Sequence, residues 1–243
     1  MNATDRNSQT GAIVPAALLL GLCLIACAFV VRSTLITMKG YGRTIQVTGS
    51  AVKPITSDFA IWEGNLTSSS LDLNGAYAKI KKDLSTTQSF LASEGFTAEQ
   101  IQIGNVQVNR SFDREGRPSG YSLYQSIKIE IADVPRISSL ALKASSLIEQ
   151  GVELNAFAPR FLYTKLENEK IEMIRLATEN ARVRADQLAS TTKMNVGSPL
   201  SARVGVFQIR PARSQEVSDY GINDMSSRDK EIVSTVNITF LIE

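Results

Sequence analysis

The chain has 243 residues, of which 43% are hydrophobic and 21% charged, and its 26 basic and 24 acidic side chains give a formal charge of +2 at pH 7. This composition excludes a disordered or low-complexity chain. The positive excess lies in residues 1–43, which leaves 22 basic and 23 acidic side chains in residues 44–243, without the positive excess typical of nucleic-acid-binding domains.

The sequence contains no histidine, and its two cysteines, Cys23 and Cys27, lie in one apolar segment. These counts exclude catalysis by a Ser-His-Asp or Cys-His arrangement, and they exclude a thiolate metal site or an intramolecular disulfide in the rest of the chain. No spacing of other reactive side chains favours a particular reaction. We therefore expect a protein that is not an enzyme, with no catalytic, cofactor-binding or metal-binding residues and no cofactor.

Residues 12–31 form an apolar segment of twenty residues without a charge, preceded by a short tail, residues 1–11. As a helix this segment would be about 30 Å long, which matches the hydrocarbon core of a bilayer. Its eleven Leu, Ile, Val and Phe residues favour insertion by about 5 kcal/mol, at roughly 0.5 kcal/mol each. The segment predicts a transmembrane signal anchor in contact with inner-membrane lipid.

Two other interpretations of this segment stay open. Ala26-Cys27-Ala28 fits the cleavage site of a signal peptide, and Leu24-Ile25-Ala26-Cys27 is similar to the lipobox of a lipoprotein. The apolar run continues to Val31, however, and exceeds the 7–15 residues of an ordinary signal core. A retained anchor is therefore the favoured interpretation.

The charges that flank the apolar segment do not decide its orientation. A positive-inside count would keep the C-terminal part inside, yet large domains translocate with little regard for charge. A thiol-free domain of this size favours an oxidising compartment. We expect a single-pass protein of the inner membrane with its C-terminal domain in the periplasm.

A short juxtamembrane linker, residues 32–42, precedes a domain that spans residues 43–243. Apolar periodicity predicts seven strands and three helices there. In chain order these are strands 43–49 and 55–68, helix 71–93, strands 101–113 and 119–131, helix 133–151, strand 152–162, helix 166–193, and strands 199–210 and 231–242.

The predicted helices have defined ends and apolar faces. Ser70 or Asp72 can cap helix 71–93, and Gly95 can end it. Its expected core face consists of Leu73, Tyr77, Ile80, Leu84 and Leu91. The expected core face of helix 133–151, which Asp133 caps, consists of Ile137, Leu140, Ala144 and Ile148. Helix 166–193 carries a narrow stripe of mostly small residues: Ile174, Ala177, Ala181, Ala185 and Leu188.

Connections between the strands indicate how they pair. Pro54 marks a turn or a sheet edge between the first two strands, and the segment Asp113 to Gly120 has the composition of a hairpin turn. A long polar connection, residues 211–229, separates the last two strands. Short turns predict largely antiparallel pairing, so the fold class is α+β, in the order ββαββα-βαββ with helices packed on the sheets.

Several segments after the anchor resemble the SIMPL-domain family, in its single-anchor inner-membrane branch. They are Ile45-Gln46-Val47-Thr48-Gly49-Ser50-Ala51, Asp58-Phe59-Ala60-Ile61-Trp62, Phe90-Leu91 with Gly95-Phe96, Tyr163-Thr164 with Leu166, Met173-Ile174 with Ala177-Thr178 and Asn180-Ala181-Arg182, and Thr235-Val236-Asn237-Ile238. The resemblance implies an α+β fold of periplasmic or membrane-anchored proteins. It also implies homo-oligomers that are ring- or channel-like in some relatives, and a link with oxidative-stress defence. It carries no catalytic residue over to this chain.

A few polar residues are weak candidates for chemistry. Asp58 and Glu63 invite a paired-carboxylate hypothesis, but their spacing on a strand points them to opposite faces. Trp62 is expected in the core or at a subunit contact. The remaining candidates are the hairpin tip 113–117 as a subunit contact, Asp219 with Asn223 and Asp224 as calcium ligands, Arg203, Arg210 and Arg213 as an anion site, and Asn65 and Asn237 as glycosylation sites. The Gly40–Gly42 and Gly104-Asn105 segments do not satisfy a phosphate-loop pattern.

These observations lead to two hypotheses of function. The first is a membrane-anchored periplasmic scaffold that assembles with copies of itself through exposed sheet edges and the 211–229 connection. The alternative is a binding module for a small molecule or a client protein, with its pocket between the sheets and helix 166–193.

Overall fold

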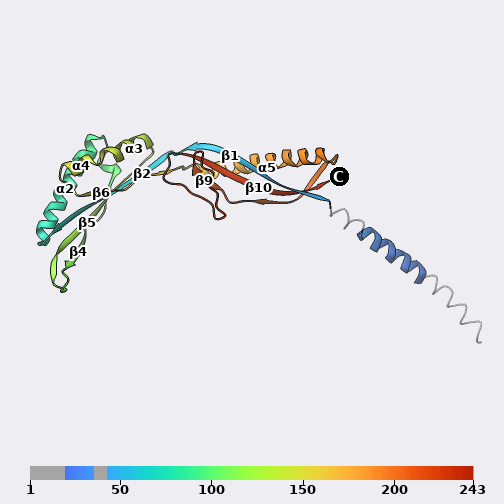
Figure 1. Cartoon of the computed structure of the whole chain (residues 1–243), viewed down its shortest axis with the longest axis horizontal. Helices are drawn as coiled ribbons and strands as arrows, with labels where there is room; N and C mark the ends of the chain where they lie inside the picture. Colours follow the sequence, from blue (N-terminus) through green and yellow to red (C-terminus); the bar gives the residue numbers. More distant parts are fainter. Residues whose placement is uncertain (1–19, 36–42, 243) are drawn as a thin grey trace, which may run out of the picture. The chain divides into compact units, whose positions relative to one another are not determined.

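The computed structural model describes residues 20–35 and 43–242 (Figure 1). Parts of the predicted N-terminal region lie outside the described residues. These are the tail 1–11, residues 12–19 of the anchor and most of the linker 32–42. Residues 20–35 are helical. Within the described ranges, the structure has no helix that is both long enough and apolar enough to cross a membrane.

The folded part of the chain forms two compact units. The described residues of the first unit fall within Met1–Gly49, Thr178–Val204 and Val236–Glu243. The second unit consists of Ser50–Ala177 and Gly205–Thr235. Both units are α+β with antiparallel sheets, in agreement with the predicted fold class.

The second unit is built on a six-stranded antiparallel sheet of order β3-β5-β2-β6, in which β4 also pairs with β5 and β7 with β2. The bounds are β2 Phe59–Ser70, α2 Leu73–Ser93, β3 Ile101–Ile103, β4 Gln107–Phe112, β5 Pro118–Ile131, α3 Val134–Lys143, α4 Ser146–Glu149, β6 Leu154–Ala156 and β7 Arg160–Leu162. With β3 and β4 counted as one broken strand, and β6 and β7 as another, this is the split βαβ arrangement.

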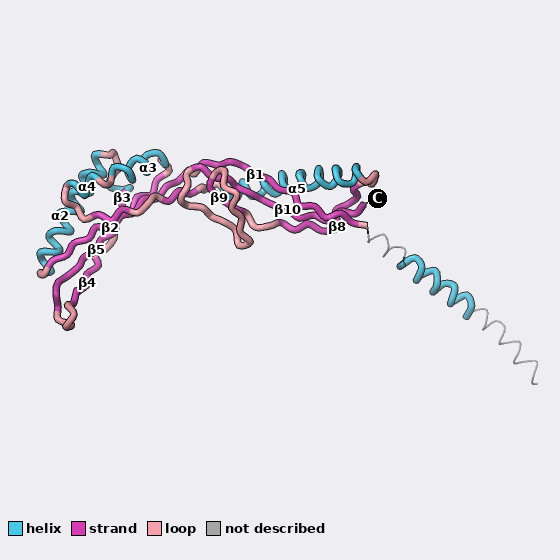
Figure 2. Tube along the Cα trace, in the orientation of Figure 1, coloured by secondary structure: helices cyan, strands magenta, loops and turns pink. Residues whose placement is uncertain are grey.

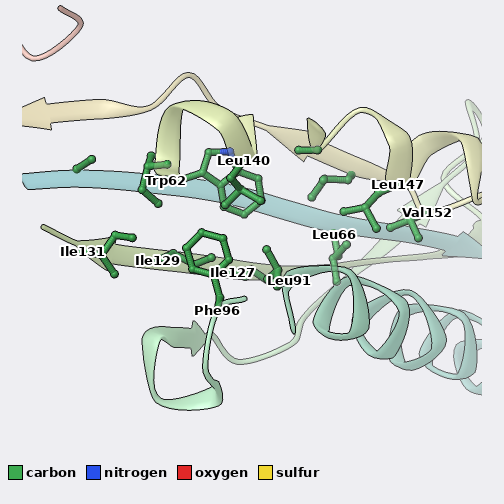
Figure 3. Packing of buried hydrophobic residues seen from close by; sticks show 14 of the residues in the cluster. Trp62, Leu66, Leu91, Phe96, Ile127, Ile129, Ile131, Leu140, Leu147 and Val152 are labelled. Carbon is green, nitrogen blue, oxygen red and sulfur yellow. The ribbon is translucent and has the colours of Figure 1, made fainter. Parts of the chain in front are cut away.

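Alternate residues of the two central strands face the same core. The β2–β5 ladder runs without a break from Ala60 opposite Ile131 to Ser70 opposite Tyr121. Period-two alternation therefore places Trp62 and Leu66 on one face with alternate residues of β5. Helices α2, α3 and α4 contribute to the same core (Figure 3). Its fully buried members include Trp62, Leu66, Ile80, Leu91, Leu123, Ile127, Ile129, Ile137, Leu140 and Leu147.

Helix α2 has the predicted ends but a different buried face. The Asp72 side chain caps it by accepting from the Gly75 N–H, and Gly95 follows it at a φ of 83°. The expected core residues Leu73 and Tyr77 are 38% and 52% exposed. The buried residues are Ala76, Ile80, Asp83, Thr87 and Leu91. Ile80 and Leu91 are therefore as predicted, and Leu84 packs against the core while partly buried. Asp83 can be buried because it accepts from the Lys79 ammonium at 2.8 Å, so the helix presents a face that apolar periodicity alone does not predict.

Three predicted elements are divided in the structure. Strand 101–113 breaks at Gly104, where an added Cβ would lie 2.2 Å from Ser126 Oγ. Strand 152–162 breaks into β6 and β7, with Pro159 between them. Helix 133–151 divides into α3 and α4, and it buries Leu147 rather than the expected Ile148, which is 59% exposed.

The remaining elements form a four-stranded sheet of order β1-β10-β8, in which β9 also pairs with β10. The bounds are β1 Thr44–Thr56, β8 Val196–Val204, β9 Gln208–Pro211 and β10 Asp229–Ile242, with the long helix α5 at Leu166–Thr191 (Figure 2). Pro54 lies within β1, which is an edge strand, so the edge interpretation of this proline is right and the turn interpretation is wrong. Although β1 and β2 are consecutive, they belong to different sheets.

Helix α5 buries a stripe of small side chains at every fourth position: Met173, Ala177, Ala181, Ala185 and Ala189. The expected stripe was correct for the three central alanines, whereas Leu188 is 52% exposed. In the first unit, Arg184 donates to the Thr48 carbonyl at 3.0 Å, and the Arg182 guanidinium lies 5.4 Å from the centre of the Phe240 ring. These two contacts hold the second half of α5 against β1 and β10.

The core of the second unit can be tested on one helix with two identical substitutions. Leu140→Ala, at a side chain 1% exposed, should lower the free energy of unfolding by about 2–5 kcal/mol because it leaves a cavity. Leu142→Ala, at a side chain 81% exposed on the same helix, should change it by less than about 0.5 kcal/mol. Chemical denaturation of both variants would measure the difference, and equal losses would contradict this description of the core.

Candidate functional site

The most exposed strand of the first unit is β8, which pairs with β10 and with no other described strand. Every residue from Ser198 to Val204 is exposed, including Leu200 at 48% and Val204 at 45%. An edge strand of this kind has unpaired backbone N–H and C=O groups along one side, and such groups can pair with a strand of another chain. We call residues 198–204 the β8 edge.

The two ends of β8 differ in how far they are protected. Arg182 of α5 donates to the carbonyls of Val196 and Gly197, at 2.9 and 3.1 Å. Pro199 follows, and the β8–β10 register is irregular around its partner Phe240. Proline and irregular pairing both hinder strand addition. The region open to another strand is therefore Leu200 to Val204.

The sheet of the second unit also has a polar face, opposite the one that packs on its core. On it, Arg160 donates to Glu63 at 2.8 Å and Lys128 contacts Glu130 at 2.6 Å. The hydrogen bond from Lys128 lowers the pKa of the Glu130 carboxyl. These side chains are 28–45% exposed, so the pairs contribute little to stability.

The carboxylates proposed as a pair have separate partners. Asp58 accepts from both the N–H and the hydroxyl of Thr164, each at 2.8 Å, whereas Glu63 contacts Arg160. Trp62 is fully buried in the core. The structure therefore gives Asp58 a role in fixing the chain before α5, and it does not support a shared acid–base role for Asp58 and Glu63.

The other candidates occupy turns, strands and ion pairs. The hairpin tip folds around Asp113 Oδ1, which accepts from the N–H groups of Glu115 and Arg117. Arg210 contacts Glu231 at 3.4 Å, and Arg203 lies opposite Asn237 in the β8–β10 ladder. Gly104-Asn105 is the break between β3 and β4, Asn65 and Asn237 lie within β2 and β10, and the Gly40–Gly42 segment lies outside the described residues.

The residues proposed as calcium ligands do not form a cluster of acidic side chains. Asp224 Oδ1 accepts from the N–H and hydroxyl of Ser226 and from the N–H of Ser227, at 2.7–3.3 Å. Among residues 20–35 and 43–242, no group of three or more Cys, Asp or Glu side chains is placed to hold a metal ion.

A polar cluster that the sequence analysis missed lies at the start of α5. Lys53 of β1 contacts Glu169 at 2.5 Å, and the Tyr163 hydroxyl donates to the other oxygen of Glu169 at 3.1 Å. The hydrogen bond from Lys53 lowers the pKa of Glu169, while burial and the contact with Glu169 raise the pKa of Tyr163. These contacts join β1 to α5 within the second unit.

The most deeply buried charged side chain of the described residues is Lys230, near the start of β10, which is 2% exposed. Its Nζ donates to the carbonyls of Phe161, at 2.6 Å, and of Asp224, at 2.5 Å. Burial lowers the pKa of this ammonium group, against a smaller effect of the Asp224 carboxylate that raises it. A neutral amine has two N–H groups, so the two carbonyls would satisfy it when the group loses its proton. Because Phe161 is far away in sequence, no local pattern pointed to this lysine.

The 211–229 connection is folded against β9 rather than extended. Ile209 exchanges backbone hydrogen bonds with the loop, donating to Ile222 and accepting from Asp224. The Gln208 side chain, 5% exposed, donates from Nε2 to the Ser218 carbonyl at 2.6 Å. Gly221 has a φ of 86°, and a Cβ there would lie 3.0 Å from the Phe207 carbonyl oxygen. Glycine is therefore required for this close approach.

Two of the hollows in the described part of the chain border the four-stranded sheet. One, of about 460 Å³, separates β1 from α5 in the first unit, with Val47, Arg184 and Leu188 among its lining residues. The other, of about 400 Å³, lies between the folded loop and strands β9 and β10 in the second unit. We call the second one the loop pocket. Its lining residues are Gly205, Val206, Gln208, Val217, Ser218, Asp219, Val233 and Thr235.

Together the split βαβ sheet, the second antiparallel sheet and the long α5 define the class of this molecule as an α+β protein with helices packed on its sheets. The model of the SIMPL family, described as a protein of unknown function (DUF541), matches residues 45–240, and the chain belongs to this family.

Two further comparisons add little. A comparison with curated proteins finds no match. Among solved structures, a similar chain is the de novo designed protein Foldit4, with 13% sequence identity and a TM-score of 0.23 over 41% of this chain and 93% of that chain.

The Lys230 contacts can be tested through stability as a function of pH. Lys230→Met removes the donor to two buried carbonyls and should lower the free energy of unfolding by about 1–3 kcal/mol at neutral pH. Because the folded-state pKa of Lys230 lies below 10.5, the unfolded chain holds more protons between these two values. The stability that Lys230 contributes therefore rises with pH, and the difference between wild type and variant should widen as pH approaches 10.5.

Denaturant unfolding between pH 7 and 10.5 would measure this difference. Lys143→Met is the matched control, because its ion pair with Glu94 is exposed and should contribute no more than about 1 kcal/mol. A Lys230 difference that stays constant or narrows over this pH range would contradict the assignment.

Proposed function

We propose that this chain is a membrane-anchored periplasmic protein of the single-anchor SIMPL branch that assembles with copies of itself into a non-enzymatic scaffold, ring- or channel-like in form. A contribution to oxidative-stress defence, which the family resemblance implies, belongs to the same proposal. The observation that carries it is the β8 edge, where Leu200 to Val204 have unpaired backbone groups beside exposed apolar side chains.

The helix at residues 20–35 supports the anchor. Its large apolar residues, including Leu20, Leu24, Ile25, Phe29 and Val31, are 55–71% exposed. A helix that is apolar on every side is typical of a membrane-embedded segment. Hydrocarbon would cover these side chains at a gain in free energy, whereas water would leave them exposed at a cost.

Anchoring also favours assembly. Subunits that are confined to one membrane meet at a high effective concentration, so modest contacts between single edges suffice to hold a closed oligomer. In a ring, strand addition would join the β8 edge of one chain to a different edge of the next, and cyclic symmetry would satisfy every such pair of edges. The lack of histidine in the sequence supports a scaffold over an enzyme.

Assembly can be tested by measuring the mass of the detergent-solubilised full chain at micromolar concentrations. The wild type should form a defined oligomer. Leu200→Lys combined with Val204→Lys should raise its dissociation constant by about tenfold or more, because charged side chains on an edge oppose strand addition. Leu142→Lys, at an exposed leucine of the second unit, is the control and should leave the mass unchanged. A monomeric wild type, or an oligomer that the double variant retains fully, would overturn the proposal.

The anchor can be tested by washing vesicles with carbonate. The wild type should stay in the membrane fraction, with a mature N-terminus that precedes the apolar segment 12–31. The double variant Leu22→Arg, Ile25→Arg places two arginines near the centre of the segment. Each raises the free energy of membrane insertion by about 3 kcal/mol, so the variant should be released from the vesicles. Ser33→Arg, outside the apolar segment, should not. Cleavage within or after the apolar segment, for example before Cys27 or after Ala28, or release of the wild type, would disprove the anchor.

The loop pocket favours a second candidate function, a periplasmic binding module for a small molecule. Gln208 is nine-tenths buried, and its Oε1 accepts no hydrogen bond from the described protein atoms. This oxygen has less than 1 Å² of accessible surface, so a ligand in the pocket would contact the apolar side chains of Val206, Val217 and Val233 and the Asp219 carboxylate. The hollow between α5 and β1 is a weaker candidate for a ligand site. Its arginine, Arg184, already donates a hydrogen bond to the Thr48 carbonyl within the protein.

A further inference from the structure

We propose that the β8 edge of one chain binds strand β4 of the next chain, which adds to it as an antiparallel strand. This inference rests on the self-assembly proposed above and names the surface of the second copy that the β8 edge binds. It follows from which sheet edges are open, from the apolar side chains that both edges carry and from the positions of two arginines.

Strand β4 is an open edge of the six-stranded sheet. Among the described strands it pairs only with β5, and all of its residues except Ser111 are exposed. At about 3.3 Å per residue, β4 is about 20 Å long and the open region Leu200 to Val204 about 17 Å. The two strands therefore match in length.

The other described edges are short or already occupied. β3, β6 and β7 have three residues each. β7 donates a backbone N–H to the 211–229 connection, and β9 exchanges two backbone hydrogen bonds with it. On β1, the Thr48 carbonyl accepts from Arg184, and Pro54 has no N–H to donate. Of the edges that the structure describes, β4 is therefore the one that best fits the β8 edge.

Both open strands carry a valine on the face of their sheet that packs on a core. Val108 lies opposite the buried Leu123 of β5, and Val204 lies opposite the buried Val236 of β10. Residues that lie opposite each other in a ladder share a face of the sheet. The two valines are nevertheless 51% and 45% exposed, because no further strand of the chain lies beside them. Pairing of β4 with β8 would bury each valine against the other.

A second apolar pair defines the direction and register of the added strand. Phe112 and Leu200 are 60% and 48% exposed, and each lies four residues from the valine of its own strand. An antiparallel pairing with Val204 opposite Val108 brings Leu200 next to Phe112. All ladders of the two sheets are antiparallel, and antiparallel pairs are slightly more stable per residue than parallel ones.

The arginines of the two strands favour the same register. With Val204 opposite Val108, Arg203 lies opposite Asn109, and Arg110 lies opposite Ala202. The two guanidinium groups are then on opposite faces of the joined sheet. A shift by one residue would place Arg203 opposite Arg110 and Val204 opposite Asn109, and like charges directly opposite each other are destabilising.

Cysteine cross-linking of the full chain in detergent tests this pairing, with Cys23 and Cys27 both changed to alanine. Opposite residues of an antiparallel pair have Cα atoms about 4.5–5.5 Å apart, which suits a disulfide. On mild oxidation, Val108→Cys with Val204→Cys in one chain should give a ladder of covalent species that ends at the mass of the oligomer. Co-expression of the two single variants should give covalent dimers and nothing larger. Dimers from Val204→Cys alone would mean that two β8 edges pair with each other, and would overturn the proposal.

Two further cysteine pairs control for direction and for background. Val204→Cys with Phe112→Cys should cross-link at least tenfold less than Val204→Cys with Val108→Cys, whereas a parallel pairing would reverse this order and overturn the proposal. Val204→Cys with Leu142→Cys, at an exposed leucine outside β4, should give no ladder. A ladder of equal yield from this control would mean random collision and would also overturn it.

A measurement without oxidation uses the dissociation constant. Val108→Lys with Phe112→Lys should raise it at least tenfold, because charged side chains on an edge oppose strand addition. Both positions are exposed, so the fold should be retained. Mixed with the Leu200→Lys, Val204→Lys variant, this variant should form a dimer, since one chain keeps its β8 edge and the other its β4. An oligomer that the β4 variant leaves unchanged would overturn the proposal.

The same samples separate this inference from the self-assembly on which it rests. A wild type that forms a defined oligomer, but whose cysteine variants give no ladder between β4 and β8, would overturn this pairing and leave self-assembly standing. A monomeric wild type would overturn both.

Discussion

The register between β2 and β5 is the constraint on which the second unit depends. Eleven consecutive residue pairs, from Ala60–Ile131 to Ser70–Tyr121, place Trp62 and Leu66 on the face that the helices cover. A slip of one residue would move this apolar set to the polar face, where Glu63 and Lys128 lie. The buried volume of Trp62 and its neighbours therefore selects one register, and the positions of α2, α3 and β6 follow from it.

Much of the fold could be predicted from the sequence because its signals are local. The Asp72 cap, the glycine at residue 95 and the central alanines of α5 each act within one or two turns of chain, and all three predictions are confirmed. The predicted buried face of α2 is confirmed at Ile80 and Leu91, but it omits Asp83, because the burial of Asp83 depends on its ion pair with Lys79. The placement of β1 and β2 in different sheets depends on partners, β10 and β5, that no short turn reveals.

The candidate sites were harder to predict for the same reason. Lys230 contacts the carbonyl of a residue 69 positions away. The environment of Gln208 depends on the folded loop, because its side-chain N–H donates to the Ser218 carbonyl. Neither residue belongs to a sequence motif. Asp58, by contrast, was considered as half of an acid–base pair, whereas in the structure its carboxylate accepts hydrogen bonds from Thr164. Side chains at such positions acquire their roles from long-range contacts, which a single sequence does not contain.

The burial of Lys230 has a consequence for how the loop responds to its surroundings. Dissolved ions screen exposed pairs such as Lys143–Glu94 but reach a group 2% exposed only weakly. The attachment of the loop to the Phe161 strand is therefore insulated from ionic strength. In a compartment whose salinity follows the external medium, the wall of the loop pocket would keep its place while the ion pairs at the surface weaken and re-form.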